Sequence, residues 1–185
     1  MTAALPAEPL SWPDLARQVT ALEEASDLHD LLAKAARTAA RQGADLLALA
    51  QVDDTGAAPR LILRTGVFPP AWRAAWVAQG PLGEGLARLA VEADGPFPLG
   101  SPMPLPFAEE DACGPQVRKG EVFPYRRPRG GEIDLVLVAG EALRDGPEAA
   151  AQHRLLADVF RAVASARLNR DRPRPRLTAR QLACL

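Results

Sequence analysis

The residue types that most often carry chemistry are few in this chain and lie far apart. His29 and His153 each lie in a long helical pattern, and neither has a partner at a metal-ligand spacing such as H-E-x-x-H, so we interpret both as surface or interface histidines. Cys113 and Cys184 do not form a C-x-x-C pair, so the sequence predicts neither a zinc site nor a disulfide framework. No nucleophile elbow, P-loop or pair of catalytic carboxylates is recognisable. We therefore expect a protein that is not an enzyme and that binds no metal and no other cofactor.

Aromatic side chains make up 5% of the residues, and most of them gather in the middle of the chain. Tryptophan and tyrosine combine a large apolar area with a hydrogen-bond donor, which suits an apolar pocket with a few polar contacts. Ordinary core packing explains the same residues equally well. If they form a ligand pocket, the candidate residues are Phe68, Trp72, Trp76, Leu86, Phe97 and Tyr125.

A tight bend that leads into a helix lies among these aromatic residues. Pro81 and the glycines around it would end a preceding helix, because proline fixes its own φ and glycine adopts conformations that other residues avoid. The residues from Leu86 to Ala90 then have the spacing of a buried helical face. This pattern predicts a wall or lid over a ligand, although an ordinary glycine-rich connection looks the same. It is not a dinucleotide-binding fingerprint, because no strand precedes it and Arg88 stands where the third glycine would be.

Hydrophobic periodicity predicts two long helices around an antiparallel sheet. One helical pattern begins after Asp27 and ends at Gly43, and another begins at Pro147. A shorter helix begins after the capping residue Ser11. Between them, apolar runs of strand length are separated by turn residues, which favours antiparallel pairing. The predicted strands cover residues 46–52, 60–64, 97–99, 121–127 and 132–139, and the last of these is predicted to be central.

The order of these elements predicts an α+β fold. We expect an antiparallel sheet with the two long helices on one face and short helices and loops on the other. The chain has 185 residues, of which 48% are hydrophobic, so it can form a real core, and its net charge of −1 excludes a uniformly basic nucleic-acid binder. The first nine residues lack the pattern of a signal peptide, and no run approaches ~18 apolar residues, so we expect neither a signal peptide nor a membrane span. We therefore expect a cytoplasmic protein without a membrane segment.

The middle of the chain resembles a GAF domain. The segment from Gly66 to Trp72 is similar to the end of a strand in that family, and the run from Pro81 to Ala87 is similar to the segment that opens the helix over its ligand pocket. The resemblance extends over residues 26 to 170 and implies a GAF-like fold with a sensor function. Similar enzymes that reduce methionine sulfoxide use several cysteines, whereas Cys113 is the only cysteine within this stretch.

The end of the chain resembles the opening of a LuxR-type helix-turn-helix domain. The residues that match that opening are Leu177, Thr178, Arg180 and Leu185, whereas Gln181, Ala183 and Cys184 depart from its usual acidic and aliphatic residues. Thr178 with Gln181 also fits a capping box at a helix start. A frayed amphipathic tail has the same pattern. The resemblance implies transcription regulation through a DNA-binding domain whose remainder is missing. The expected organisation is a helical segment over residues 1–25, the sensor domain over 26–169, an Arg/Pro linker over 170–176 and the start of the DNA-binding domain over 177–185.

Residues 68–76 also resemble the aromatic phrase of autoinducer-binding domains, which precede LuxR-type DNA-binding domains. Trp72 matches a pocket tryptophan of that family, whereas Phe68 and Trp76 stand where tyrosines are usual. Gly85 stands where that family has the aspartate that holds the ligand amide. An acyl-homoserine lactone would therefore lose a charge-assisted hydrogen bond in this chain.

These observations lead to a preferred function and two alternatives. The preferred function is a cytoplasmic, non-catalytic sensor domain that binds an unidentified small molecule and regulates an attached DNA-binding domain, which alone would contact DNA. The alternatives are a degenerate GAF-like module for dimerisation or protein docking that binds no small ligand, and an autoinducer-binding-like domain. We expect a homodimer through the long helices, because they hold more apolar residues than one sheet face needs. These residues are Leu28, Leu32, Leu155, Val159 and Val163.

Overall fold

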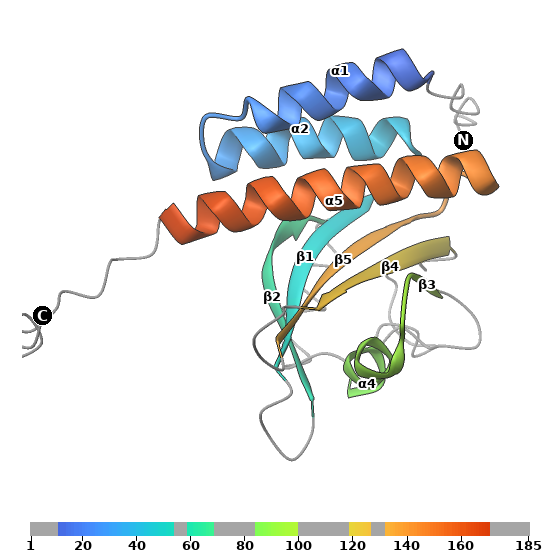
Figure 1. The fold of residues 1–185 in the computed structure, drawn as a ribbon. Helices are drawn as coiled ribbons and strands as arrows, with labels where there is room; N and C mark the ends of the chain where they lie inside the picture. Colours follow the sequence, from blue (N-terminus) through green and yellow to red (C-terminus); the bar gives the residue numbers. More distant parts are fainter. Residues whose placement is uncertain (1–10, 54–58, 69–83, 100–118, 127–131, 171–185) are drawn as a thin grey trace, which may run out of the picture.

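The computed structural model describes residues 11–53, 59–68, 84–99, 119–126 and 132–170. They form a five-stranded antiparallel sheet with the strand order β2-β1-β5-β4-β3 (Figure 1). The predicted antiparallel sheet is therefore confirmed, and β5 occupies its predicted central place. The strands are β1 (Leu46–Asp53), β2 (Arg60–Val67), β3 (Phe97–Leu99), β4 (Lys119–Arg126) and β5 (Glu132–Gly140).

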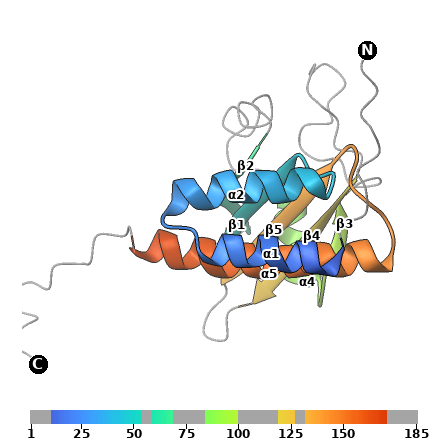
Figure 2. The same cartoon turned by 90° about the horizontal axis from the view of Figure 1, so that it is seen from above.

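Helices cover the two faces of the sheet unequally. The long helices α2 (Leu28–Arg41) and α5 (Pro147–Arg170) lie on one face, called here the helix face, as predicted (Figure 1). The shorter α4 (Glu84–Glu92) lies on the opposite or distal face. The first helix, α1 (Trp12–Glu23), contacts both α2 and α5, and seen from above it lies over α5 with α2 alongside (Figure 2). The helix face therefore carries one more helix than the two that were predicted.

Local signals explain where the helices begin and end. Ser11 caps α1 by accepting a hydrogen bond from a first-turn backbone N–H at 3.3 Å, and Asp27 caps α2 in the same way at 2.9 Å. After α2, Gly43 adopts a φ of +76°. A Cβ at Gly43 would lie 2.0 Å from the carbonyl oxygen of Ala142, so this turn accepts only glycine without a backbone shift.

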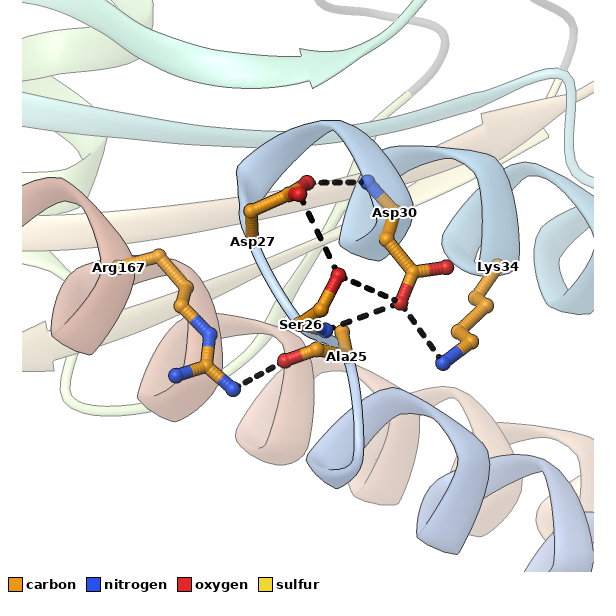
Figure 3. Close-up of polar contacts among 6 residues, drawn as sticks. All are labelled: Ala25, Ser26, Asp27, Asp30, Lys34 and Arg167. Carbon is orange, nitrogen blue, oxygen red and sulfur yellow. Dashed lines mark hydrogen bonds and ion pairs between the residues drawn. The ribbon is translucent and has the colours of Figure 1, made fainter.

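Polar contacts hold the turn between α1 and α2 from both sides (Figure 3). The Asp30 carboxylate accepts a hydrogen bond from the Ser26 backbone N–H at 2.9 Å and pairs with Lys34 at 2.9 Å. From α5, the Arg167 guanidinium donates a hydrogen bond to the carbonyl oxygen of Ala25. The last turns of α5 are thus joined to the connection between the first two helices.

This turn predicts a loss of stability in acid. The pKa of Asp27 is lowered mainly by the Asp30 backbone N–H, and the pKa of Asp30 mainly by Lys34, both from an ordinary value of 3.8. A lowered pKa stabilises the fold above the ordinary value, and this contribution is lost as the pH falls through the folded-state pKa. We expect the melting temperature to decrease once the pH is below about 4.

The Asp27→Asn variant tests this expectation, because asparagine keeps a capping side chain but carries no charge. Its melting temperature at pH 7 should change little, and the decrease of its melting temperature in acid should be shallower than in wild type. Thermal unfolding followed by circular dichroism measures the melting temperature at pH 7 and in acid. If the melting temperature of the variant decreased as steeply in acid as that of wild type, the Asp27 carboxylate would not contribute to the acid dependence.

The sheet separates two apolar clusters. Alternate residues of β1 and β5 face opposite sides, and nearly all of them are buried, as is typical of central strands. The helix-face cluster lies between the sheet and the helices and includes Leu47, Leu49, Val136, Leu156 and Phe160. The distal cluster lies between the sheet and α4 and includes Leu46, Leu61, Leu86, Leu135 and Leu137.

Candidate functional site

The structure brings Phe68, Leu86 and Phe97 of the predicted pocket together on the distal face. Leu86 in α4 is buried in the distal cluster, and Phe68 and Phe97 are partly buried against it. Phe68 follows β2 and Phe97 begins β3, so three separate elements contribute. Trp72 and Trp76 lie outside the described residues.

Tyr125 lies on the opposite face from the one predicted. Its ring packs against the helix-face cluster, and its hydroxyl donates a hydrogen bond to Asp158 of α5 at 2.7 Å. Side chains alternate along a strand, and Val122 belongs to the distal cluster, so Tyr125 at three residues' distance faces the helices. The prediction grouped Tyr125 with the other aromatic residues by type, and it was wrong because strand parity decides the face.

Small residues form part of the distal face of the sheet. We call this part the distal floor, and its residues are Ala48, Ala50, Gly66, Gly120 and Ala139. Ala48 is paired with Gly66 between β1 and β2, and Ala139 is paired with Gly120 between β5 and β4. A Cβ at Gly66 would lie 2.8 Å from the ring of Phe68, so this ring lies directly over the glycine. Ala48, Ala50 and Ala139 are at most 1% exposed, so apolar side chains cover this floor in the structure, and an apolar ligand would have to replace part of that covering.

The covering helix α4 is fixed to the sheet at its C-terminal end. Arg126, the last residue of β4, donates hydrogen bonds to the carbonyl oxygens of Val91 at 2.5 Å and Ala93 at 3.0 Å. The last carbonyl groups of a helix lack partners within it and attract a cation. On its inner side, α4 buries Leu86 and Ala90 in the distal cluster. Its position over the floor therefore depends on one guanidinium group as well as on apolar packing.

Polar side chains directly behind the distal cluster join the sheet to α5. Asp134 lies on β5 between Ile133 and Leu135, which both face the distal cluster. The Asp134 side chain is buried and lies 3.8 Å from the Arg161 guanidinium of α5. Arg161 in turn lies over the ring of Tyr125, 4.5 Å from its centroid, in cation–π geometry. One strand thus carries part of the distal face and an anchor for α5.

The hydrogen bond between Tyr125 and Asp158 strengthens this anchor. Burial, and next the hydrogen bond to Asp158, raise the pKa of Tyr125 well above its ordinary value of 10.0. The hydroxyl therefore remains protonated and remains the donor throughout the physiological pH range.

A further polar contact joins the first two strands. The Arg64 guanidinium of β2 donates a hydrogen bond to the side-chain oxygen of Gln51 of β1 at 2.6 Å. Polar contacts therefore extend over several strands on the helix face.

His153 is buried in the protein interior, which corrects the interpretation of it as a surface or interface histidine. It is fully buried in α5, and its Nδ1 atom lies 3.2 Å from the Glu121 carboxylate of β4. Its Nε2 atom is buried and has no hydrogen-bond partner within the described part of the chain. His153 shares the spacing of Leu156 and Phe160, a signal that could have placed it on the buried side of the helix. His29 is exposed, as expected.

The described ranges bear on metal binding and on membrane insertion. Within those ranges, no group of three or more His, Cys, Asp or Glu residues is placed so that it could hold a metal ion. The helices that the structure describes include none with the length and apolar character required to cross a bilayer.

Comparison with solved structures identifies the fold. The N-acylhomoserine lactone-dependent LuxR family transcription factor CepR2 from Burkholderia cenocepacia matches 83% of this chain and 93% of its own, with a TM-score of 0.56 and 14% identity. The GAF domain of a phosphoenolpyruvate-protein phosphotransferase from Coxiella burnetii matches 84% of this chain and 93% of its own, with a TM-score of 0.57 and 18% identity. The chain has a GAF-like fold. This confirms the α+β architecture predicted from the order of elements and from the GAF resemblance.

The same fold also occurs in an enzyme. The free methionine-R-sulfoxide reductase from Neisseria meningitidis matches 89% of this chain and 99% of its own, with a TM-score of 0.51 and 19% identity. Identities this low establish the fold alone, and one fold supports many functions. Neither a family model nor a curated protein matches the sequence.

Proposed function

We propose that this chain is a cytoplasmic, non-catalytic sensor domain that binds a small, largely apolar molecule between the distal floor and α4. The unequal covering of the sheet is the main observation in its favour. Two long helices and α1 cover the helix face, whereas among the described residues α4 is the helix on the distal face. A surface of small side chains under one short helix can admit a ligand at less cost than a face covered by continuous long helices. The GAF-like fold, shared with a lactone-dependent transcription factor, also supports the proposed sensor function.

The signal would travel through β5 to α5. Ile133 and Leu135 face the distal cluster, while Asp134 between them is close to Arg161 of α5. A ligand that favours one position of β5 would thereby favour one position of α5. Residues 170–176 would pass this change as a linker to a DNA-binding domain that begins at 177–185, after a sensor domain over 26–169 and a helical segment over 1–25. The candidate residues Trp72 and Trp76 would complete the pocket with Phe68, Leu86 and Phe97.

Catalysis is the competing possibility that the reductase match raises. That enzyme shares the fold, and its name states that its substrate is a sulfoxide. In this chain, Cys113 is the only cysteine in the proposed sensor domain, and thiol chemistry that ends in a disulfide requires a second cysteine. The cysteine content therefore favours sensing over catalysis.

Matched substitutions of two fully buried alanines test the proposed site. Ala50 belongs to the distal floor, and Ala157 faces the sheet from α5. We expect Ala157→Leu to lower the free energy of unfolding by about 1–3 kcal/mol, because it overpacks a closed core. Ala50→Leu should cost less and should abolish stabilisation by a ligand. An equal loss of stability in both variants would indicate a solid distal face and would favour the docking module.

Two neutral probes serve as ligands in this test, namely N-octanoyl-homoserine lactone and 1-octanoylglycerol. They share an acyl chain and differ in the headgroup. Because Gly85 stands where autoinducer-binding domains have an aspartate, we expect the glycerol ester to raise the melting temperature at least as much as the lactone. A clear preference for the lactone would contradict this expectation.

We also propose a homodimer through α2 and α5. Leu28, Leu32, Val159 and Val163 pack partly against the helix-face cluster, so they are not all available to a second copy. Leu155 lies outside both clusters and is partly exposed on α5. We expect sedimentation velocity to show a dimer at micromolar concentration and Leu155→Glu to shift it to a folded monomer. A wild-type monomer at high micromolar concentration would contradict the proposal.

A further inference from the structure

A charged groove lies between α1 and α2, in the layer farthest from the distal face. It has a volume of ≈ 460 Å³ and is lined by residues of both helices. A space of this size can hold a drug-sized molecule. The cationic side chains in its lining are Arg17 from α1 and Lys34, Arg37 and Arg41 from α2.

Carboxylates neutralise only part of this charge. Arg17 pairs with Asp14 on α1, and Lys34 pairs with Asp30 on α2 at 2.9 Å. Arg37 and Arg41 lie one helical turn apart and are exposed, and neither forms an ion pair with another described residue. Two guanidinium groups at this spacing repel each other in an empty groove, and an anion between them would relieve that repulsion.

Charges on the two helices already interact across the groove. Hydrogen bonds from Ser11 and Arg17 lower the pKa of Asp14, and Arg41 from the opposite helix lowers it further. Asp14 is the one carboxylate in the lining, so the groove has an excess of positive charge. An anionic ligand would therefore meet the guanidinium groups of both helices.

The groove also contains polar groups that lack partners. Both amide atoms of Gln18 are buried, and neither has a hydrogen-bond partner among the residues that the structure describes. Burying an amide without a partner is unfavourable, so a ligand oxygen that accepts from its NH₂ group would stabilise the fold. Thr38 in the same lining is 3% exposed and already donates its hydroxyl to the Lys34 carbonyl. Because both amide atoms are buried, a ligand would reach Gln18 as a neutral donor only after the side chain rotates toward the groove.

We propose that this groove is a second binding site, which takes a small molecule with adjacent phosphate groups. Three guanidinium groups and one ammonium group match the charge of such a ligand, and the guanidinium fork matches the oxygen geometry of phosphate. The site is separate from the distal floor, so it does not depend on the proposed sensor function. Its ligand would bridge α1 and α2, whose connecting turn is already joined to the end of α5 through Arg167.

Calorimetric titration of the full chain with inorganic pyrophosphate at constant ionic strength tests the proposal. We expect a dissociation constant below about 1 mM. Arg37→Gln/Arg41→Gln should weaken binding at least about tenfold, because it removes charge-assisted hydrogen bonds. Arg154→Gln/Arg170→Gln removes two exposed arginines of α5 that do not line the groove and should leave the affinity unchanged. Arginine and glutamine have similar helix propensities, so both variants should fold, which circular dichroism checks.

Four other outcomes would overturn the proposal. Citrate that binds as tightly as pyrophosphate would show a site for polyanions in general and not for phosphate groups. An equal loss of affinity in both double variants, or no measurable binding by the wild type, would show that the groove holds no site. A short DNA duplex that binds more tightly than pyrophosphate, with the same dependence on Arg37 and Arg41, would show a nucleic-acid contact in its place.

Discussion

Phe160→Ala should lower the free energy of unfolding by about 3–5 kcal/mol. Phe160 is fully buried and lies in the helix-face cluster between α5 and the sheet. Removing its ring would leave a cavity that rigid neighbours on the sheet and on α2 cannot close. For a domain of this size, the melting temperature should fall by roughly 6–20 °C.

An exposed residue of the same helix provides the control. Arg154→Ala truncates a long side chain on α5 and should change the free energy of unfolding by less than about 0.5 kcal/mol. Thermal and urea unfolding of the two variants beside wild type measures the difference. If Phe160→Ala were as mild as Arg154→Ala, the helix face could not be the main core of the fold.

Gly43→Ala should be the second severe substitution. A residue with a Cβ in a left-handed conformation costs about 1–3 kcal/mol, and Gly43 has a φ of +76°. In addition, the new Cβ would lie 2.0 Å from a backbone oxygen of Ala142, which no rotamer change can relieve. We therefore expect a loss beyond the conformational cost alone.

Two other glycines distinguish the cost of the left-handed conformation from the cost of the clash with Ala142. Gly146 has a φ of +106° but open space around it, so Gly146→Ala should show the conformational cost without a clash. Gly95 has no positive φ, and no atom lies within 4 Å of an added Cβ, so Gly95→Ala should be neutral or slightly stabilising. The expected order of stability loss in urea unfolding is Gly43, Gly146, Gly95. A loss at Gly146 that equals the loss at Gly43 would show that the clash with Ala142 contributes nothing.

Local signals in the sequence were enough to predict most of the architecture. The caps at Ser11 and Asp27 and the glycine at Gly43 mark helix ends by short-range hydrogen bonds and backbone conformation, which do not depend on the rest of the fold. The apolar run of β5 identified the central strand, because a strand buried on both faces lacks alternation.

The contacts between elements were harder to predict. Tyr125 was placed on the wrong face, because strand parity is fixed by the register with β5 and not by residue type. His153 was interpreted as a surface or interface histidine, because its partner Glu121 comes from a strand 32 positions earlier and is not apparent from the helix sequence. The outer position of α1 and its charged groove with α2 also depend on tertiary packing, which periodicity within one helix does not encode.

The location of the bound probe tests the central claim most directly. Methyl resonances of Ala50 and Leu135 report on the distal face, and those of Leu156 and Ala157 report on the helix face. During titration with 1-octanoylglycerol, we predict saturable chemical-shift changes at Ala50 and Leu135, with smaller changes at Leu156 and Ala157 that follow the same binding curve. Shift changes confined to the helix face, or none at a probe concentration near its solubility limit, would contradict a ligand site on the distal face.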